Sequence, residues 1–379
     1  MKFLSNHFRS LLCTLAIVLL AVSQIADARA SELQANSKQS EATLRLNITQ
    51  HDAVYRDYLL SDGGRLPEAR IHYATLGSPH RNASGQIDNA VLLLHWTGAS
   101  GKALQSEEFQ KALYAPGAPL DANRYFLIIP DNLGHGASTK PSDGLKAKFP
   151  QYGYSDLVTL QHKLVTETLG IERLHAIVGL SMGGMNAWEW AERYPAATDG
   201  IMPVVALPVR IAGRNLLWRA MAAKWIQEDP AYDHGNYTAQ PRGLALSSEL
   251  ARLMIEGVPH FQQIIPDVSA AQQFLSAVDQ QSASSDANDL LYSLLSSRDY
   301  SPEGRLSEVR TKVYALNFDD DEFNPVGLGI LQRTVTQVPN ARYAVQPGTP
   351  ESHGHLTMAH PGLWANQVAI FMKSIEPQN

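Results

Sequence analysis

The sequence predicts an α/β fold: a mostly parallel, doubly wound β-sheet with an inserted helical cap. Short apolar runs alternate along the chain with longer amphipathic stretches, which is the pattern of strand–helix–strand units. Several of these runs are nearly continuous in Val, Ile and Leu, as strands buried on both faces are. The alternation stops between residues 211 and 306, where the sequence has mostly helical character.

Composition limits the class of protein. Of the 379 residues, 44% are hydrophobic and 18% are charged, which is typical of a globular protein. The formal net charge is −6 and no basic run occurs, so a typical nucleic-acid-binding protein is excluded. The single cysteine, Cys13, excludes a disulfide framework and cysteine-based metal or redox sites.

Residues 1–30 have the three parts of a secretory signal peptide. Lys2 and Arg9 precede an apolar run over residues 11–22, and small residues before Ser31 form a cleavage site after Ala30. The run of about a dozen residues is shorter than the ~20 that a membrane-spanning helix needs. An uncleaved anchor or a buried N-terminal helix are the alternatives. We expect the mature chain to have no membrane span and to be exported, either to the periplasm or outside the cell.

The remaining chain divides into a core and an insertion. Residues 31–45 are polar and aperiodic, which predicts a loose lead-in. The expected core comprises residues 46–210 and 307–379, and the expected helical cap comprises residues 211–306. The strand candidates of the core are residues 91–95, 125–130, 176–180, 200–205, 313–317 and 343–346, and a helix is expected over residues 156–169.

The strongest chemical signal is Gly179-Leu180-Ser181-Met182-Gly183. The pattern G-x-S-x-G is common by chance, but here an apolar strand candidate precedes it and a helix-like stretch follows it. That is the setting of a nucleophile elbow, in which glycines allow a sharp turn that exposes the serine hydroxyl. We therefore predict that Ser181 is a nucleophile. The alternative is a glycine-rich turn with a serine that has no role.

Two backbone amides are candidates for an oxyanion hole. The Met182 N–H lies near the start of the helix, where the helix dipole favours negative charge. A second donor is expected in the loop after an early strand, and Trp96 in His95-Trp96-Thr97-Gly98 occupies that place. His95 itself, and His135 in a glycine-rich loop, are expected to be packed and hydrogen-bonded rather than catalytic.

The C-terminal third supplies a base and an acid in the order that such serine enzymes use. Asp319-Asp320-Asp321 follows one strand candidate, and His353-Gly354-His355 follows the next. We favour His355 as the base, with His353 as a neighbour that fixes the loop. We favour Asp321 as the acid, with Asp320 in reserve. Adjacent carboxylates repel, so one should face the histidine and the others solvent.

A competing interpretation assigns His353, His355, His360 and the acidic run to a metal site. Their spacing matches no metal-binding motif, and His360 is expected on the following helix. A serine nucleophile also needs no metal. We therefore expect neither a metal ion nor a cofactor.

With these residues in view, the chain resembles the α/β-hydrolase superfamily and, within it, the homoserine O-acetyltransferase-like group, from about Tyr55 to Phe371. The segments that carry the resemblance are His95-Trp96-Thr97-Gly98, residues 179–190, Asp229-Pro230 with Gly235 and Tyr237, residues 241–244, residues 286–289, and Gly354-His355. The resemblance implies an α/β-hydrolase fold. It also implies Ser181 as nucleophile, Asp321 rather than Asp320 as the acid, His355 as the base, and the Trp96 and Met182 amides as the oxyanion hole.

The departures from the transferase pattern favour water as the acyl acceptor. The H-x-L-T-G turn of the group is shortened to His95-Trp96-Thr97-Gly98, and its G-H-D motif reads Gly354-His355-Leu356. Residues 207–215 and 286–300 look more like a hydrolase branch. An exported enzyme would also not meet acetyl-coenzyme A, a cytoplasmic metabolite.

We therefore expect an exported serine hydrolase that cleaves a carboxylic ester or an amide through a Ser-His-Asp triad and an acyl-enzyme. The alternatives are an O-acyltransferase with the same triad and a non-catalytic ligand-binding protein on the same fold. The expected partner is a small acyl substrate and not a nucleic acid, and the sequence is compatible with a homodimer. The aromatic residues expected to line the substrate pocket are Trp218, Trp225, Tyr232, Tyr237, Phe261 and Tyr292.

Overall fold

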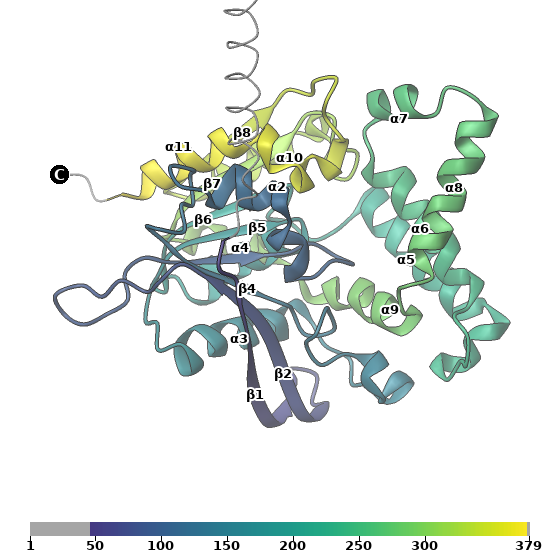
Figure 1. Cartoon of the computed structure of the whole chain (residues 1–379), viewed down its shortest axis with the longest axis horizontal. Helices are drawn as coiled ribbons and strands as arrows, with labels where there is room; N and C mark the ends of the chain where they lie inside the picture. The colour runs from purple at the N-terminus through teal and green to yellow at the C-terminus, as the bar shows by residue number, and fades with distance from the viewer. Residues whose placement is uncertain (1–45, 377–379) are drawn as a thin grey trace, which may run out of the picture. The chain divides into compact units, whose positions relative to one another are not determined.

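One mixed sheet of eight strands organises residues 46–376, the part of the chain that this computed structural model describes (Figure 1). The predicted signal peptide and lead-in, residues 1–45, lie outside the described residues. The strand order is β1-β2-β4-β3-β5-β6-β7-β8. The strands are β1 Thr49–Leu59, β2 Arg65–Leu76, β3 Ala90–Leu94, β4 Phe126–Pro130, β5 Leu174–Leu180, β6 Thr198–Val204, β7 Lys312–Phe318 and β8 Ala341–Gln346.

The prediction of a mostly parallel sheet is confirmed. β3 to β8 run parallel to their neighbours, and only the contacts of β1 with β2 and of β2 with β4 are antiparallel. All six strand candidates coincide with strands from β3 to β8. β1 and β2 had no counterpart in the sequence analysis. In β1 only Ala53 is buried, so this edge strand lacks the apolar run by which the others were recognised.

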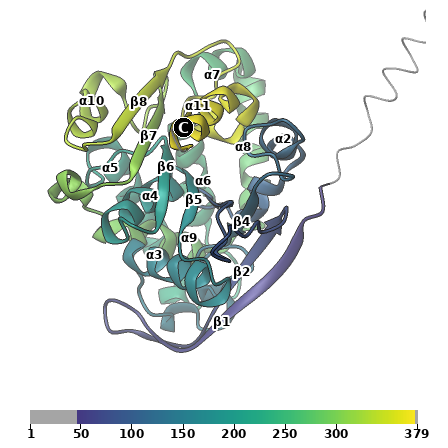
Figure 2. The same ribbon diagram turned by 90° about the vertical axis from the view of Figure 1, so that its left-hand side faces the viewer.

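Helices cover both faces of the sheet (Figure 2). In β3 every residue is buried, because alternate side chains enter two separate cores. Leu92 and Leu94 pack in the core that includes α3 and α4, whereas Val91 and Leu93 pack in the core that includes α11. This two-sided burial explains why the strands are apolar throughout. The helices of the core are α2 Glu107–Phe109, α3 Tyr154–Lys163, α4 Met182–Arg193, α10 Ile330–Val335 and α11 Ala365–Ile375.

Between β6 and β7 the described chain forms five α-helices and short 3-10 turns, with no strand. The helices are α5 Gly213–Glu228, α6 Arg242–Ile255, α7 Val258–Ile264, α8 Val268–Ser282 and α9 Ala287–Leu295. We call these five helices the cap. They lie together on the right of Figure 1 and have small hydrophobic cores of their own. None of the helices within residues 46–376 has the length and apolar character needed to cross a membrane.

The turn from β5 to α4 leaves no space for side chains at its glycines. A β-carbon at Gly183 would overlap the carbonyl oxygen of Leu94 at the end of β3. One at Gly184 would lie 2.6 Å from the β-carbon of Ala206. Glycine is therefore required where the first turn of α4 passes over the neighbouring strands.

Replacing Gly183 by alanine should destabilise the protein, because the obstructing atom belongs to a buried strand that cannot move without disturbing the sheet. We expect the free energy of unfolding to fall by about 2 kcal/mol or more, as measured by urea denaturation. Gly304 provides the control, since a β-carbon added there would meet no atom within 4 Å. Gly304→Ala should change stability by less than about 0.5 kcal/mol. Equal stability of the two variants would contradict the packing argument.

Candidate active site

Three side chains from separate loops meet in a hydrogen-bonded relay at the carboxyl edge of the sheet. Ser181 directly follows β5, Asp321 follows β7, and His355 follows β8. The Nε2 atom of His355 lies 2.9 Å from the Ser181 hydroxyl, and its Nδ1 atom lies 2.9 Å from Oδ2 of Asp321. With the ring hydrogen on Nδ1, His355 donates to the carboxylate and accepts from the serine. Parallel strands bring these distant residues together because their carboxyl ends lie along one edge.

Asp321 is fixed by more hydrogen bonds than the one to His355. The backbone amides of Phe323 and Asn324 donate to its Oδ1 atom, at 2.8 and 3.1 Å. The Asn324 side chain donates to its Oδ2 atom at 3.0 Å. The residue is only 2% exposed. A carboxyl group held by several donors orients the imidazole firmly.

The other two carboxylates of the acidic run have different roles. Asp319 accepts a hydrogen bond from the Gly348 amide and is exposed. Asp320 accepts one from the Gly354 amide at 3.0 Å, and burial raises the pKa of its carboxyl group. The expectation that the remaining carboxylates face solvent was therefore wrong for Asp320. It is partly buried, and it holds the loop that carries His355.

Ser181 has the backbone geometry of a strained turn, with φ of 51° and ψ of −108°. Its N–H donates to the Val204 carbonyl at 2.9 Å, which anchors the turn to β6. Met182 then begins α4, so its N–H belongs to the first turn, where helix amides have no carbonyl partner within the helix. Trp96 lines the same cavity as Ser181. Of the two residues whose amides are expected to form an oxyanion hole, Met182 thus follows the serine directly and Trp96 lines the same cavity.

His95 and His135 are packed inside the protein. Asn132 N–H donates to Nε2 of His95 at 3.1 Å, and Nδ1 of His95 lies 2.9 Å from the Trp96 carbonyl oxygen. Burial lowers the pKa of His95 to about 4. Nε2 of His135 lies 2.8 Å from the Ser293 hydroxyl, and burial lowers the pKa of His135 to about 3. Both rings are neutral structural groups, and His95 fixes the peptide that follows Trp96.

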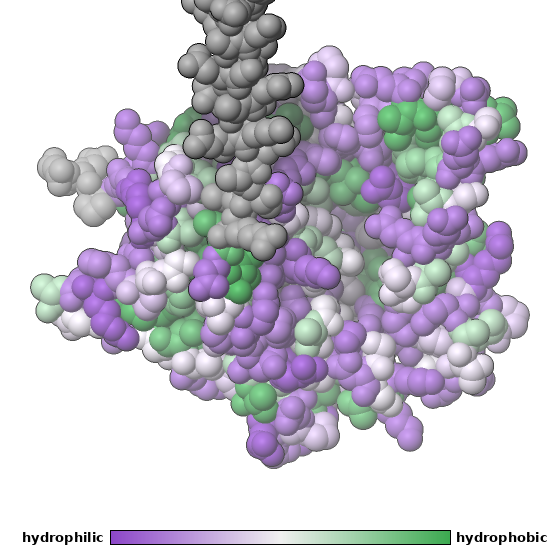
Figure 3. All heavy atoms as spheres, in the orientation of Figure 1, coloured by the Kyte–Doolittle hydropathy of each residue, from purple (hydrophilic) through white to green (hydrophobic). Residues whose placement is uncertain are grey.

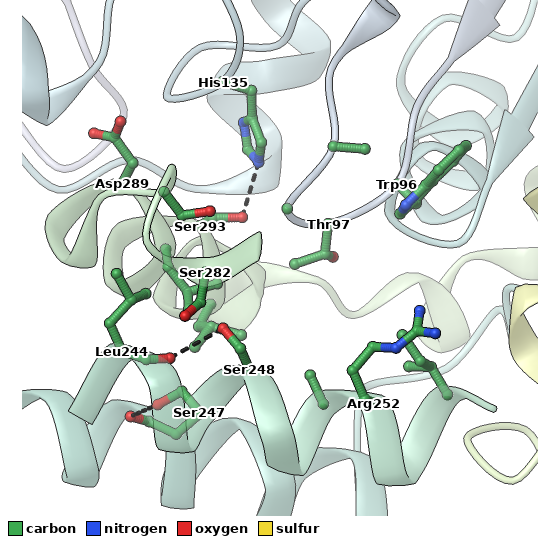
Figure 4. A pocket seen from close by; sticks show the side chains of 18 of the residues that line it. Trp96, Thr97, His135, Leu244, Ser247, Ser248, Arg252, Ser282, Asp289 and Ser293 are labelled. Atoms are coloured by element: carbon green, nitrogen blue, oxygen red, sulfur yellow. Dashed lines mark hydrogen bonds between the residues drawn. The ribbon is translucent and has the colours of Figure 1, made fainter. Parts of the chain in front are cut away.

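The relay opens into a cavity of about 690 Å³ between the sheet and the cap. Trp96, Leu356 and Phe323 lie on its wall near Ser181 and His355. Figure 4 shows Trp96, Thr97 and His135 opposite the α6 side chains Leu244, Ser247, Ser248 and Arg252, with Ser282 of α8 and Asp289 and Ser293 of α9 toward the left of the view. This volume is typical of a site for a small organic ligand. The lining is mixed: Trp218, Leu244 and Leu290 are apolar, whereas Ser248, Arg252 and Asp289 are polar.

The aromatic residues predicted to line the pocket divide into three groups. Trp218 lines the cavity and its ring lies 5.2 Å from that of Phe323. Trp225 and Phe261 instead line a second, apolar cavity of about 540 Å³ among α5 to α8, near the green surface over α7 in Figure 3. The prediction was wrong for three tyrosines, which are buried in the protein interior. Their hydroxyls bond to Asn288, Asp286 and the Phe149 carbonyl, and they are Tyr232, Tyr237 and Tyr292.

Two lining residues were missed although the sequence places them beside predicted ones. Phe323 follows Asp321 by two residues, and its ring lies 4.9 Å from the ring of His355. Leu356 follows His355 directly. Their closeness in sequence to Asp321 and His355 could have identified both as lining residues. Arg252 could not have been found in this way, because only the packing of α6 brings it to the cavity.

The competing metal set is not gathered at one point. His355 is engaged by Ser181 and Asp321, and His360 pairs with Glu108 at 3.2 Å. His360 also precedes a 3-10 turn over Pro361–Leu363, so its predicted place on the following helix was wrong. His353 faces Glu256 of the cap, with 3.1 Å between Nδ1 and Oε1. This contact supports its expected part in fixing the loop.

Comparison with known proteins identifies the family. The alpha/beta hydrolase fold family matches residues 89–280, just over half of the chain. The chain belongs to this family. Similar α/β-hydrolase structures include an acetylester hydrolase from Corynebacterium glutamicum, with a TM-score of 0.74 and 21% identity over 86% of this chain and 96% of that one. A homoserine O-acetyltransferase from Bacillus anthracis gives a TM-score of 0.75 and 21% identity over 86% and 98%. The predicted α/β-hydrolase fold is thereby confirmed.

Curated relatives in the same α/β-hydrolase family are named as acyltransferases. A probable acyltransferase from Methanothermobacter thermautotrophicus is 27% identical over 71% of this chain and 82% of its own length. A homoserine O-succinyltransferase from Magnetococcus marinus is 34% identical over 51% and 54%, and a homoserine O-acetyltransferase from Thermobifida fusca is 31% identical over 54% and 57%. The chain thus spans about half the length of these two. The predicted resemblance to the homoserine O-acetyltransferase-like group is confirmed.

The buried His135 predicts a measurable pH dependence of stability. Burial lowers its pKa from 6.5 to about 3. Between these values only the unfolded chain binds a proton at this residue, so the free energy of unfolding falls as the pH is lowered, by up to about 1.4 kcal/mol per pH unit. His135→Gln should remove this contribution. We expect urea denaturation to show that, as the pH is lowered from 6.5 to 4.5, the free energy of unfolding falls less steeply, or rises more steeply, in the variant than in the wild type.

The comparison must be made between the two proteins, because buried acids act in the opposite sense. Burial raises the pKa of Glu189 to about 7 and that of Asp289 to about 6. Over part of the same range these groups bind protons only in the folded chain, so they stabilise it as the pH falls. An identical pH dependence in wild type and His135→Gln would show that His135 is not excluded from protonation.

Proposed function

We propose that this protein is a serine hydrolase that cleaves a carboxylic ester, or less readily an amide, through an acyl-enzyme on Ser181. The observation that carries the proposal is the relay from Ser181 through His355 to the buried Asp321, open to a cavity of about 690 Å³. A ligand-binding protein would need the cavity but not the relay. The arrangement therefore favours catalysis over binding alone.

In the proposed reaction the Ser181 oxygen attacks the carbonyl carbon of the substrate while Nε2 of His355 takes the serine proton. Asp321 keeps the ring hydrogen on Nδ1 and stabilises the imidazolium that forms. His355 then gives its proton to the leaving oxygen or nitrogen, and the alcohol or amine departs. Water attacks the acyl-enzyme, again with His355 as the base, and releases the acid and Ser181. Every step uses groups of the chain and water, so no cofactor is needed.

The tetrahedral intermediates carry a negative oxygen that needs donors. We assign this role to the Trp96 and Met182 amides. Met182 contributes a first-turn amide of α4, where the partial positive charge of the helix N-terminus adds to the hydrogen bond. The hydrogen bond of His95 to the Trp96 carbonyl, at 2.9 Å, restrains the loop that bears the other donor.

Two sequence departures support water as the acyl acceptor. Leu356 stands where the transferase motif has an aspartate, and it lies on the wall of the cavity. A polar acyl acceptor would therefore find no carboxylate partner at this position beside the relay. Trp96 lies in the shortened turn and also lines the cavity, so it adds a bulky apolar ring to the wall. Trp96, Phe323 and Leu356 suit an acyl chain better than a charged amino acid.

Acyl transfer to an alcohol is the second candidate. It is favoured by the names of the curated relatives, which include homoserine acetyl- and succinyltransferases at 31 and 34% identity. Both reactions share the acyl-enzyme, and they differ only in whether water or the hydroxyl group of an alcohol attacks it to release Ser181.

We also propose that the enzyme is exported to the periplasm or beyond the cell. Lys2 and Arg9, the apolar residues 11–22 and the small residues up to Ala30 support this proposal. In that location water and extracellular esters are abundant and acyl-coenzyme A is not. Export and hydrolysis therefore support each other.

Substitutions should distinguish the relay residues Ser181 and Asp321 from the neighbouring Asp320. Ser181→Ala should lower kcat by at least about 10⁴-fold, and Asp321→Asn by about 10⁴-fold, because the amide favours the wrong ring tautomer of His355. Asp320→Asn should retain activity within about tenfold, since an amide oxygen can still accept the Gly354 N–H. The measurement is hydrolysis of p-nitrophenyl esters, with circular dichroism to confirm that each variant folds.

A fluorophosphonate should label Ser181 in the folded wild type and not in Ser181→Ala. Absence of labelling in folded protein, or an Asp320→Asn defect as large as that of Asp321→Asn, would contradict the assignment.

The fate of the acyl group distinguishes hydrolysis from transfer. With acyl esters of graded chain length, we expect the free acid to be the main product even with about 1 mM homoserine or a simple alcohol present. Mass spectrometry of the products gives the partition directly. If most of the acyl group appears on the added alcohol, the enzyme is a transferase and the proposal of water as acceptor fails.

A further inference from the structure

A second group of polar side chains lies outside the relay, where the cap meets the loop that carries His355. Glu256 follows the last residue of α6, and His260 lies on α7. His353 comes from the loop before the 3-10 turn Gly354–Ala359. Oε1 of Glu256 lies 2.9 Å from Nδ1 of His260 and 3.1 Å from Nδ1 of His353. One ligand-type atom from each residue lies within 4.8 Å of the other two.

The carboxylate at the centre of this group is buried and already oriented. Glu256 is 3% exposed, whereas the two histidine side chains are 20 and 22% exposed. The Arg252 guanidinium donates to Oε2 of Glu256 at 3.3 Å. This leaves Oε1 directed at both imidazoles. A ligating carboxylate whose other oxygen is held by a hydrogen bond is a common arrangement in metal sites.

The ring of His353 is also restrained from its other side. The His360 ring stacks on it with 4.1 Å between ring centres, and the His260 ring meets it edge-on at 4.1 Å. His360 itself pairs with Glu108 at 3.2 Å. His353 is thus held in place with Nδ1 toward the carboxylate.

We propose that Glu256, His260 and His353 bind a divalent transition-metal ion, for which Zn²⁺ is the best match. Two imidazole nitrogens and one carboxylate oxygen are a zinc donor set, usually completed by water in the fourth position. Metal–ligand distances of about 2.0–2.1 Å place tetrahedral ligands about 3.3 Å apart. The two contacts to Oε1 need to lengthen by only a few tenths of an ångström. The partial exposure of the histidines leaves access for the ion and for water.

Each imidazole presents Nδ1 toward Oε1 of Glu256, so the Nδ1 lone pair can go to the metal when the ring hydrogen is on Nε2. The carboxylate, as a ligand, partly offsets the charge of the ion.

An ion at this place would connect the cap to the catalytic loop. Glu256 and His260 belong to the cap, and His353 precedes His355 by two residues. The backbones are already in close contact, since a β-carbon at Gly257 would lie 2.8 Å from the Gly354 nitrogen. Arg252 extends the connection to the substrate cavity, which it lines. The bound ion is a structural clamp between the two parts rather than a participant in the reaction.

The test is metal binding by the full-length protein after treatment with a chelator. Isothermal titration should show one Zn²⁺ per chain with a low-micromolar or tighter Kd. Saturating Zn²⁺ should raise Tm by about 3 °C or more. Co²⁺ should produce the visible absorption of a four-coordinate nitrogen–oxygen site.

Variants assign the binding to these residues. His260→Ala and Glu256→Gln should each lower the affinity at least about tenfold and abolish the rise in Tm. His80→Ala is the matched control, because His80 is an exposed histidine that pairs with Asp88 elsewhere. If Glu256→Gln fails to fold, His260→Ala still tests whether these residues bind the ion, because His260 is partly exposed. Ser181→Ala should bind Zn²⁺ normally, so this proposal and the proposed function fail separately.

Two outcomes would overturn the proposal. The first is wild-type protein that shows no stoichiometric binding of Zn²⁺ or Co²⁺. The histidines would then serve only as hydrogen-bond donors to Glu256. The second is unchanged affinity in His260→Ala, which would place any bound ion elsewhere.

Discussion

The close packing of the β5–α4 turn against β3 and β6 is the constraint on which the site depends. Ser181 occupies a backbone conformation with positive φ that is costly for a residue with a side chain. The hydrogen bond from its N–H to the Val204 carbonyl holds it there, together with the absence of side chains at Gly183 and Gly184. The hydroxyl therefore projects from the edge of the sheet toward the loops after β7 and β8. A looser turn would leave the serine without its imidazole.

The acidic run shows how three identical neighbours acquire different tasks. Asp319 lies at the surface and caps a loop, Asp320 holds the Gly354 amide, and Asp321 turns inward to His355. The division follows from the turn that begins as β7 ends, where the Asp321 N–H bonds to the Phe318 carbonyl at 3.3 Å. Two carboxylates on one loop thus position the same histidine: Asp321 contacts its ring, and Asp320 accepts from the amide of the preceding residue, Gly354.

Sequence reasoning could select Ser181 and His355 as candidates because glycines and strand ends mark such positions, and the structure places their side chains 2.9 Å apart. The sequence alone favours Asp321 over Asp320, and the family resemblance strengthens that choice because adjacent aspartates differ little in local sequence. The tyrosines of the cap were misplaced because their hydroxyls find partners such as Asn288 that no periodicity reveals. The contact of His353 with Glu256 joins residues 97 positions apart, and only the folded chain brings them together.

The polar character of β1 has a consequence for assembly. This strand forms one edge of the sheet, and Asp52, Arg56 and Asp57 are exposed along it. An unprotected edge invites hydrogen bonding by a strand of another molecule, and charged side chains oppose such an addition. These charges therefore disfavour an association of two copies that extends one continuous sheet across β1.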